Sequence, residues 1–310
     1  MKIKEIAKLC GLIVYGNGDF QVEGITYSED AQEQDISVAF KKSDIFKTKS
    51  KVVLSEPFFE QSDKILLLCQ YGQLFPSLVK IAKLLAKNDP QLKLCCNSDF
   101  AHNQEKFVIG PNSVIGKSTI IGPFSTIGTN VCIGDNCVIE SNVFIGDNTV
   151  IGDNCVIHSG AKIGVASYFH YKEDGKNKVF EGIGKTIINS DCQIGFNSVI
   201  QRGTLSNTVI GKNVLIGNLV LIAHDVKIGD SCMLICQSGI SGRVIIGKRV
   251  SIWGKTGVKD NVSIGDDSCI LAMSAVTKNV GKGKVISGLF SREHKNELKI
   301  QGFIERLFRK

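Results

Sequence analysis

Residues 126–157 read TIGTNVCIGDNCVIESNVFIGDNTVIGDNCVI, with an isoleucine at every sixth position. The same ladder runs from Ile109 to Ile163 and, after an interruption, resumes from Ile210 to Val276. A fixed short period over such a length is typical of a solenoid of stacked strands. Three six-residue units would make one triangular coil, with the isoleucines stacked inside. At the strand spacing of about 4.8 Å, about nine coils would give a prism of roughly 40 Å.

The residues between the isoleucines favour sharp corners. A typical unit is 133–138, Ile-Gly-Asp-Asn-Cys-Val, in which three turn-forming residues follow the isoleucine. Glycine, asparagine and aspartate tolerate the positive φ angles that tight corners demand. The repeat region is therefore predicted to be mostly β structure.

The first hundred residues lack the repeat and predict a separate α/β domain. Helices are expected at Lys4–Leu9 and, from its apolar spacing, at Phe75–Lys87. Short apolar runs between polar turns predict strands at Phe20–Ile25, Ile36–Phe40, Lys51–Leu54 and Lys64–Leu68. We expect an α/β domain over 1–100, a linker over 97–106, a β-helix domain over 107–289 and a basic C-terminal helix over 291–310.

The C-terminal stretch carries most of the net charge. From Lys278 to Lys310 nine Lys and Arg residues face three Glu, which is +6 of the chain's formal +7. Such a basic field attracts an acidic protein, an anionic membrane surface or nucleic acid, although a simply solvated tail is the alternative. A short helix is marginal alone, so we expect this one to pack on the prism or on partner subunits through Leu298, Ile300, Phe303, Ile304, Leu307 and Phe308.

The composition is that of an ordinary soluble protein, with 43% hydrophobic and 22% charged residues. No run approaches the roughly 18 to 20 apolar residues of a membrane span. Lys2, Lys4, Glu5 and Lys8 near the start do not suit a signal peptide. We therefore expect a cytoplasmic protein.

Eleven cysteines follow neither a disulfide nor a zinc pattern. There is no CxxC pair, and Cys95 and Cys96 are adjacent, which is too constrained for ordinary bridging or paired ligation. A metal site on this fold needs several convergent histidines from adjacent coils, so we expect no metal. We expect reduced structural thiols packed in the repeats at Cys132, Cys137, Cys155, Cys192, Cys232 and Cys269.

Two interruptions break the ladder. Val165–Gly182 is an excursion rich in aromatic and charged residues, and Gln201–Thr208 shifts the register before Ile210. Insertions in a solenoid map to one face, which is often the binding face.

Of the five histidines, only His224 is interpreted as lying in the middle of a well-formed repeat, two residues after Ile222. Its side chain should approach a face or corner of the prism. Acyl transfer to an amine or hydroxyl needs a base of near-neutral pKa to remove the proton of the nucleophile, and histidine supplies it. A positioned base contributes about 10²- to 10⁴-fold. On spacing alone, a surface histidine without such a role is the alternative.

Three motifs follow one another around this histidine: Arg202-Gly203, then Leu205-Ser206-Asn207-Thr208, then Ile222-Ala223-His224-Asp225-Val226-Lys227-Ile228-Gly229. This order resembles the UDP-3-O-acylglucosamine N-acyltransferase family of lipid A biosynthesis, which has an Arg-Gly pair, a register break and then Ile-Ala-His-Asn-Val-x-Ile-Gly. The excursion Val165–Gly182 looks like the Gly-Phe-Gly-Tyr loop of that family. The segment Gly16–Ile25 resembles its uridine-binding module.

The resemblance implies a left-handed parallel β-helix and a homotrimer with active sites between adjacent prisms. It implies that His224 is the general base that deprotonates the 2-amine of a glucosamine acceptor, and that this amine attacks a hydroxyacyl thioester on acyl carrier protein. No cofactor would be bound permanently, because the phosphopantetheine arm comes with the carrier protein, which the basic tail would meet. Substrate contacts would come from Asn218, which matches a position at that arm, and from Arg202, Tyr168, His170 and Tyr171, and a backbone N–H for the oxyanion from Gly239 or Gly242.

Some positions depart from the family pattern. Gln201 stands where the family has Asp before the Arg-Gly pair, and Asn261 stands where it has a second histidine. Lys41-Lys42-Ser43 stand where a uracil-contacting Asn is expected. These departures concern the acceptor more than the reaction class.

Two other readings stay open. The same prism could use a coenzyme A thioester on another amino-sugar or alcohol, or the protein could be a non-catalytic scaffold or a sugar-binding protein. Nucleic-acid binding is not expected, because no aromatic platform or reading motif accompanies the basic tail.

Overall fold

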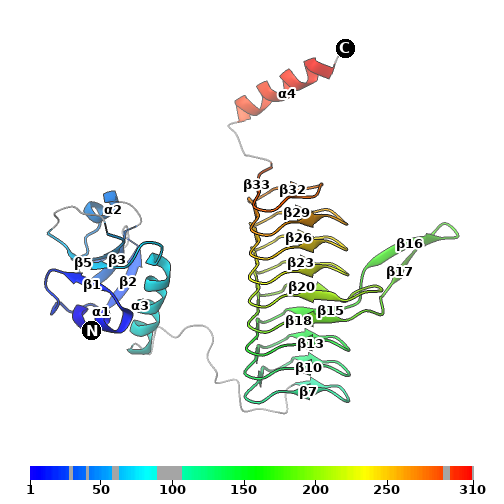
Figure 1. The fold of residues 1–310 in the computed structure, drawn as a ribbon, viewed down its shortest axis with the longest axis horizontal. Helices are drawn as coiled ribbons and strands as arrows, with labels where there is room; N and C mark the ends of the chain where they lie inside the picture. Colours follow the sequence, from blue (N-terminus) through cyan, green and yellow to red (C-terminus); the bar gives the residue numbers. More distant parts are fainter. Residues whose placement is uncertain (28–30, 40–41, 58–62, 89–106, 289–293, 309–310) are drawn as a thin grey trace. The chain divides into compact units, whose positions relative to one another are not determined.

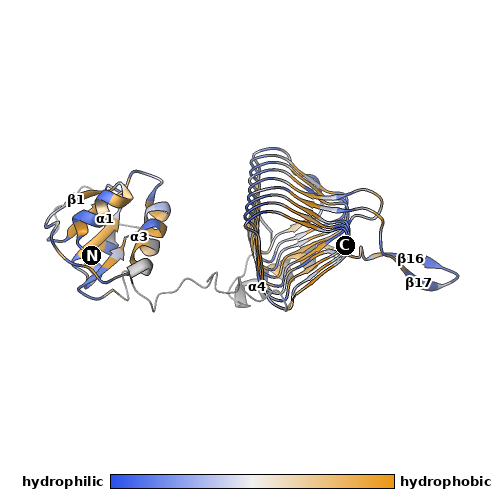
Figure 2. Ribbon diagram, turned by 90° about the horizontal axis from the view of Figure 1, so that it is seen from below, coloured by the Kyte–Doolittle hydropathy of each residue, from blue (hydrophilic) through white to orange (hydrophobic). Residues whose placement is uncertain are grey.

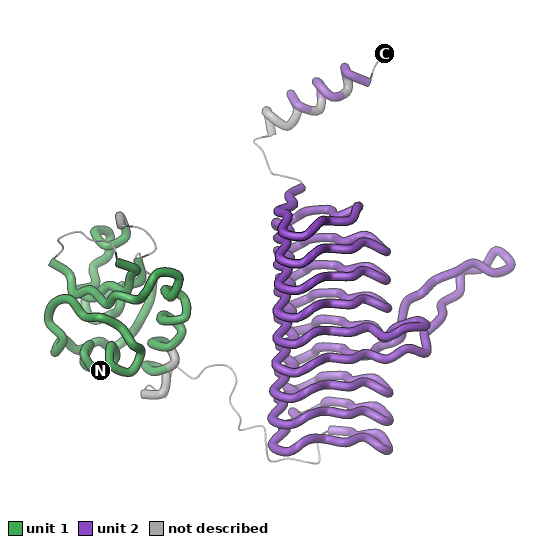
Figure 3. Tube along the Cα trace, viewed as in Figure 1, with its two compact units in different colours: residues 1–97 green, residues 98–310 purple. Residues whose placement is uncertain are grey.

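The computed structural model describes residues 1–27, 31–39, 42–57, 63–88, 107–288 and 294–308. It divides into two compact units, Met1–Asn97 and Ser98–Lys310 (Figure 3). The hydrophobic clusters of the two units share no residues, so each unit has a core of its own.

The first unit is built on one five-stranded sheet. The strands lie in the order β1-β5-β4-β3-β2, with β1 antiparallel to β5 and the others parallel (Figure 1). Buried residues of the sheet and of its helices form two clusters, a larger one that includes Ile6, Val52 and Ile81 and a smaller one that includes Ile45 and Val53. The elements are α1 (Ile3–Cys10), β1 (Ile13–Tyr15), β2 (Gly24–Tyr27), β3 (Asp35–Val38), α2 (Lys42–Lys47), β4 (Val52–Ser55), β5 (Ile65–Leu68) and α3 (Leu74–Asn88).

Most elements of this unit occur where the sequence predicts them, and three differ. The predicted helices correspond to α1 and α3, whereas β2 begins four residues after its predicted start, and β1 and α2 were not predicted. β1 has three residues between Gly11 and Gly16, both at positive φ, so it is too short for an alternating pattern to show. Phe40, Lys41 and the linker expected over 97–106 lie outside the described residues.

The second unit is a left-handed parallel β-helix with three sheets of stacked short strands (Figure 1). We name each sheet after its first strand: the β6 sheet, the β7 sheet and the β8 sheet. The strands of the β6 sheet are β6 (Val108–Ile109), β9 (Thr126–Ile127), β12 (Phe144–Ile145), β15 (Lys162–Val165), β20 (Val199–Gln201), β23 (Leu221–Ile222), β26 (Gly239–Ile240), β29 (Gly257–Val258) and β32 (Ala275–Val276). The strands of the β7 sheet are β7 (Val114–Ile115), β10 (Cys132–Ile133), β13 (Val150–Ile151), β18 (Thr186–Ile188), β21 (Thr208–Ile210), β24 (Lys227–Ile228), β27 (Ile245–Ile246) and β30 (Ser263–Ile264). The strands of the β8 sheet are β8 (Ile120–Ile121), β11 (Val138–Ile139), β14 (Val156–Ile157), β19 (Gln193–Ile194), β22 (Leu215–Ile216), β25 (Met233–Leu234), β28 (Ser251–Ile252), β31 (Cys269–Ile270) and β33 (Val285–Ile286).

The isoleucine ladder is the core of this unit. Ile139, Ile157 and Ile194 pair in register on neighbouring strands, and all three are completely buried. Burying one such side chain stabilises the fold by about 1.5 to 3 kcal/mol. Because the coils contribute equivalent residues, the ladder from Ile121 to Val276 forms one continuous cluster, whereas Ile109 at its start is exposed.

Each coil turns at three edges, which we name after the sheets that they join: the β6–β7 edge, the β7–β8 edge and the β8–β6 edge. The corner residues have positive φ, most often an asparagine such as Asn130, Asn136 or Asn142, with φ between 55° and 59°. The same position also holds bulky residues, among them Phe124 and Leu219. The repeat therefore needs this backbone conformation more than it needs a particular side chain.

Both interruptions of the ladder leave the prism at the β6–β7 edge. The first holds a hairpin of β16 (Phe169–Glu173) and β17 (Lys176–Phe180), which separates β15 from β18. Strand partners are 37 residues apart across it, as in Val150↔Ile187, against 18 in the regular coils. Across the second interruption partners are 22 residues apart, as in Val199↔Leu221. Figures 1 and 2 show the hairpin projecting from the coils, and Figure 2 shows that it is hydrophilic.

The cysteines of the repeats follow the prediction only in part. Cys137, Cys155, Cys192 and Cys232 are free and buried just after the corner of the β7–β8 edge. Cys132 occupies the outward position of β10 and is exposed, so it does not pack inside the coil. Cys95 and Cys96 lie outside the described residues.

The C-terminal helix α4 spans His294–Phe308. Its apolar side chains are exposed in the single chain, at Ile300, Phe303, Ile304, Leu307 and Phe308. In the ranges that the structure describes, no helix has both the length and the apolar run required to cross a membrane.

Backbone strain at one corner provides a test of the fold. Phe124 is 73% exposed and has φ of 61°, a conformation that costs most residues about 1 to 2 kcal/mol. We expect Phe124→Asn to raise the free energy of unfolding by about 1 kcal/mol, seen as a higher urea midpoint. Val114→Asn is the control, because Val114 is 62% exposed but lies on a strand, where asparagine is unfavourable. An equal loss of stability in both variants would contradict this account.

Candidate active site

His224 lies at the β6–β7 edge, directly after β23. The hairpin and the 201–208 loop leave the prism at this same edge on the two preceding coils. Three consecutive coils therefore bring an insertion, a loop and a histidine to one place. Two of these three features, the hairpin and the loop, are the interruptions of the repeat. The candidate site therefore forms where the repeat is interrupted.

The imidazole of His224 is held by the neighbouring carboxylate. Nδ1 of His224 lies 2.8 Å from Oδ2 of Asp225, and both residues are only 8% exposed. Asp225 is the corner residue of its turn, with φ of 60°, and its N–H donates to Oγ1 of Thr208 at 2.9 Å. In this conformation the carboxylate of Asp225 contacts both the imidazole of His224 and the loop of the preceding coil.

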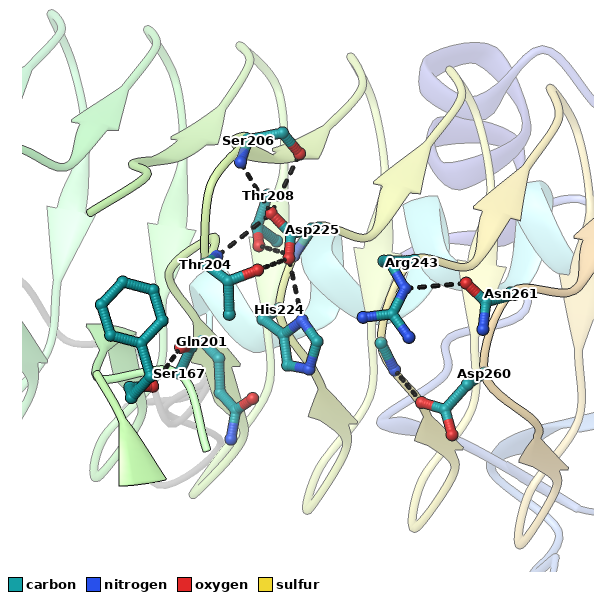
Figure 4. A network of polar contacts seen from close by, with 12 residues as sticks. Ser167, Gln201, Thr204, Ser206, Thr208, His224, Asp225, Arg243, Asp260 and Asn261 are labelled. Carbon is teal, nitrogen blue, oxygen red and sulfur yellow. Dashed lines mark hydrogen bonds and ion pairs between the residues drawn. The ribbon is translucent and has the colours of Figure 1, made fainter. Parts of the chain in front are cut away.

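The 201–208 loop supplies the other partners of this carboxylate (Figure 4). Oδ1 of Asp225 accepts hydrogen bonds from the N–H of Thr204 at 3.1 Å, the N–H of Ser206 at 3.0 Å and the hydroxyl of Ser206 at 2.9 Å. Oδ2 also accepts from the hydroxyl of Thr204. Although burial raises the pKa of Asp225, the hydrogen bonds from Thr204, His224 and Ser206 lower it to about 2. The carboxylate is therefore ionised at neutral pH.

An ionised carboxylate can only accept hydrogen bonds. Nδ1 of His224 must therefore carry the ring proton, and Nε2 of the neutral ring presents a lone pair. This is the arrangement in which a third group orients a general base.

At two positions near His224 the backbone passes so close to its neighbours that only glycine fits. A Cβ on Gly203 would lie 1.7 Å from the carbonyl oxygen of Ser206, so the Arg-Gly pair needs its glycine for the loop to close. A Cβ on Gly242 would lie 2.5 Å from Cε1 of His224, so the next coil can pass the imidazole only as glycine. The edge of the ring also meets Phe169 of the hairpin, with ring centroids 5.6 Å apart.

Two cavities meet at this edge. The larger has a volume of about 980 Å³ and is floored by outward residues of the β6 sheet, of which Gly239 and Gly257 have no side chain. The smaller, about 460 Å³, lies against Asp225. The larger is lined by Tyr168, Phe169, His170, Gln201, Leu221, Ala223, His224, Gly239, Ile240, Ser241, Gly242, Arg243, Gly257, Val258, Lys259, Asp260, Val276 and Thr277, and the smaller by Phe169, Phe180, Thr204, Leu205, Ser206, Asp225, Lys227, Arg243 and Ile245.

Four further predicted site residues line the larger cavity with His224: Tyr168, His170, Gly239 and Gly242. Three others are not among the described residues that line either cavity: Tyr171, Arg202 and Asn218.

The three residues outside the cavities have other surroundings. Nε of Arg202 donates to the carbonyl oxygen of Gly184 at 2.8 Å, which ties the 201–208 loop to the segment that follows the hairpin. Tyr171 lies on β16. Asn218 belongs to the β8–β6 edge, where its Oδ1 accepts from the N–H of Phe196 at 3.0 Å.

The two glycines proposed for the oxyanion already use their N–H groups. The N–H of Gly239 donates to the carbonyl oxygen of Thr256 at 2.9 Å, as part of the strand ladder. The N–H of Gly242 donates to Oδ1 of Asp260 at 2.9 Å. Neither group is available to a substrate in this arrangement.

The interpretation that only His224 lies inside a well-formed repeat is wrong. His158 takes the place of the glycine after Ile157, at the β8–β6 edge, and is also 8% exposed. Its Nδ1 lies 2.9 Å from Oε1 of Glu140, and its Nε2 accepts from the side-chain amide of Gln193 at 2.8 Å. It stacks on Phe196 with centroids 4.6 Å apart. His158 thus links its own coil to the coils of Glu140 and Gln193. Because both of its ring nitrogens are hydrogen-bonded, neither is free to act as a base.

The sequence interpretation missed the residues that orient His224. In the sequence, Asp225 is a carboxylate next to the histidine, and Thr204 and Ser206 lie in the register break. Their hydrogen bonds to Asp225 form only once the coils are stacked. Phe169 lies in the aromatic excursion but was not proposed as a site residue, and Arg243 carried no local signal. No three His, Cys, Asp or Glu side chains gather as a metal site within the residues described.

Comparison with known proteins shows that the chain is similar to acyltransferases built from hexapeptide repeats. The family described as Bacterial transferase hexapeptide (six repeats) matches residues 108–141, 133–164 and 207–242. A UDP-3-O-acylglucosamine N-acyltransferase of Coxiella burnetii is 34% identical over 259 residues, which cover 77% of this chain and 74% of the relative. Another of that name from Azorhizobium caulinodans is 40% identical over 83 residues, 27% of this chain and 23% of the relative.

Solved structures point to the same fold. The UDP-N-acetylglucosamine acyltransferase of Francisella novicida superposes with a TM-score of 0.55 at 29% identity, covering 64% of this chain and 73% of the other. The UDP-N-acetylglucosamine O-acyltransferase of Moraxella catarrhalis gives a TM-score of 0.53 at 31% identity, covering 63% and 76%.

The Asp225 network predicts the tautomer of His224. In Asp225→Asn, the side-chain oxygen can serve either the loop N–H groups or Nδ1 of His224, but not both. We expect the oxygen to stay with the loop, so that the new amide faces Nδ1 and moves the ring proton to Nε2. Nitrogen-15 NMR of the neutral ring should show Nδ1–H in the wild type and Nε2–H in the variant. The same tautomer in both proteins would contradict the assignment.

The two histidine–carboxylate pairs should differ in what they stabilise. His158→Ala removes contacts to coils on both sides and leaves a largely buried carboxylate with fewer donors, so we expect a loss of about 2 to 3 kcal/mol. His224→Ala leaves Asp225 with four donors from the 201–208 loop and should lose less. Urea unfolding of both variants measures the difference. A larger loss in His224→Ala would reverse the proposed roles.

Proposed function

Because the chain belongs to the UDP-3-O-acylglucosamine N-acyltransferase family, we propose that it transfers a hydroxyacyl chain from acyl carrier protein to the 2-amine of a UDP-3-O-acylglucosamine-type acceptor in lipid A biosynthesis. The chain is an acyltransferase, as its family membership shows. The observation that carries the proposal is the imidazole of His224, fixed by Asp225 at 2.8 Å and bordering a cavity of about 980 Å³.

In the proposed reaction Nε2 of His224 removes a proton from the acceptor amine. The nitrogen attacks the carbonyl carbon of the thioester, a C–N bond forms, and the carbonyl π electrons move to oxygen. When the tetrahedral intermediate collapses, the C–S bond breaks and the imidazolium returns the proton to the leaving thiolate. Asp225, ionised throughout, stabilises the imidazolium in between. The base contributes about 10²- to 10⁴-fold.

The donor side of the site would require a second copy of the chain. His224 lies at the β6–β7 edge, whereas Asn218, the proposed contact for the phosphopantetheine arm, lies at the β8–β6 edge. The strand β23 separates these two edges within one coil. A site between neighbouring subunits would bring the two edges together, which agrees with the homotrimer that the family resemblance implies. The basic C-terminal tail would steer the acidic carrier protein to such an assembly.

The acceptor would occupy the larger cavity near the hairpin. Tyr168 and His170 line it, with Gln201 beside them. Tyr171 and Arg202 would act on the acceptor indirectly, by shaping the hairpin and its base.

The shape of the cavity favours a long acyl chain. Gly239 and Gly257 lie at paired outward positions of β26 and β29, so the floor of the cavity is bare backbone over two coils. An acetyl group carried by coenzyme A would not need that length. The cavity thus supports carrier-protein-dependent transfer over the coenzyme A alternative.

The decisive assay is transfer from a hydroxyacyl-acyl carrier protein to UDP-3-O-acylglucosamine by wild type and by His224→Ala. We expect the wild type to turn over and the variant to lose about 10²-fold or more in kcat. His170→Ala is the matched control, a histidine at the same cavity whose removal should change KM more than kcat. If folded wild type transfers only from a coenzyme A thioester, the proposal that acyl carrier protein is the donor is wrong. Full activity of His224→Ala would overturn the base.

A further inference from the structure

In the transition state of the proposed transfer, a negative charge develops on the thioester oxygen. Two aspartates, Asp225 and Asp260, already lie near that place. The oxyanion would form beside His224, between the ionised Asp225 on one side and Asp260 on the other. The backbone donors expected there are occupied, because Gly239 donates to Thr256 and Gly242 donates to Asp260. An oxyanion at this edge therefore needs a hydrogen-bond donor other than these two N–H groups.

Arg243 occupies the position that such a donor requires. It is the corner residue of the turn after β26, with φ of 59°, one coil beyond Asp225. Its N–H donates to the carbonyl oxygen of His224 at 3.0 Å, and it directly follows the glycine on which the imidazole packs. Arg243 lines both cavities, and Figure 4 shows its guanidinium between His224 and Asn261.

The guanidinium of Arg243 is anchored at one atom only. Its Nε donates to Oδ1 of Asn261, the corner residue of the next coil, at 2.7 Å. Asn261 stands where the family pattern has a second histidine, so the amide at this position serves to hold the arginine. Within the described ranges the terminal nitrogens of Arg243 make no further hydrogen bond or ion pair.

Arg249 shows what an ordinary corner arginine does in this fold. It is the corner residue of the following turn, at the β7–β8 edge, with φ of 56°. Its Nε and Nη2 bind the two carboxylate oxygens of Asp267 at 2.6 Å and 3.0 Å, which neutralises its charge. Arg243 has the neutral Asn261 in the equivalent place, so its charge and its terminal donors remain directed to the cavity.

We propose that Arg243 is a catalytic residue of the proposed transfer and donates from its terminal guanidinium nitrogens to the oxyanion of the tetrahedral intermediate. This inference rests on the proposed function. When the acceptor amine attacks, the electron pair of the C=O bond moves to oxygen, and the guanidinium stabilises that oxygen without giving up a proton. The electron pair returns when the C–S bond breaks. Removing one such donor costs about 10²- to 10³-fold in kcat.

The test compares Arg243→Met, Arg243→Lys and the control Arg249→Met in the carrier-protein assay, with kcat and KM measured for donor and acceptor. We expect Arg243→Met to lose about 10²-fold in kcat, with each KM within a few-fold of the wild type. Arg243→Lys should recover part of the loss, and Arg249→Met should keep the wild-type kcat. Added methylguanidinium should restore turnover to Arg243→Ala in a saturable manner.

Three outcomes would overturn the inference. A rise in KM at unchanged kcat would make Arg243 a substrate-binding residue. A fall in melting temperature with no guanidinium rescue would make it a structural one. Wild-type kcat in Arg243→Met, while His224→Ala is inactive, would refute the role of Arg243 and leave the proposed function standing. An inactive wild type would instead remove the proposed function itself.

Discussion

The constraint on which everything else depends is the in-register stacking of one coil on the next. In the regular coils each isoleucine pairs with its counterpart 18 residues away, and the buried ladder allows no residue to be added within a face. A one-residue slip in a strand would turn the buried side chains outward. Additional chain can therefore leave the prism only at an edge. The hairpin, the 201–208 loop and His224 all lie at the same edge, where they border a cavity.

The same geometry explains how a single histidine is oriented without a deep pocket. Asp225 occupies a corner whose backbone conformation the fold requires in every coil, and the loop of the preceding coil directs hydrogen bonds to its carboxylate. The charge on this carboxylate is fixed by those donors, and that fixes the tautomer of the ring. His158 has a carboxylate partner too, but Gln193 occupies its second nitrogen. The two histidines are equally buried. They differ because Nε2 of His224 is left to accept a proton, whereas Nε2 of His158 is bound by Gln193.

The regular part of the molecule could be predicted from the sequence because its contacts repeat at a fixed spacing. The ladder, the corners and the position of His224 follow from the period and from the motif around Ile222. The partners of Asp225 could not be predicted, since Thr204 lies 21 residues away across a break of unknown path. His158 escaped notice because it replaces a glycine, and the spacing of the isoleucines is undisturbed there. β1 is too short to show an alternating pattern.

The most direct measurement of the central claim is one distance, between Nε2 of His224 and the acceptor nitrogen. It would be read from a structure with the acceptor and an acyl donor in which a methylene replaces the thioester sulfur. The account predicts about 2.6 to 3.2 Å, the hydrogen-bonding reach of a general base, with Nδ1 still bound to Asp225. An acceptor nitrogen at another edge of the prism, or one contacting a different base, would contradict it.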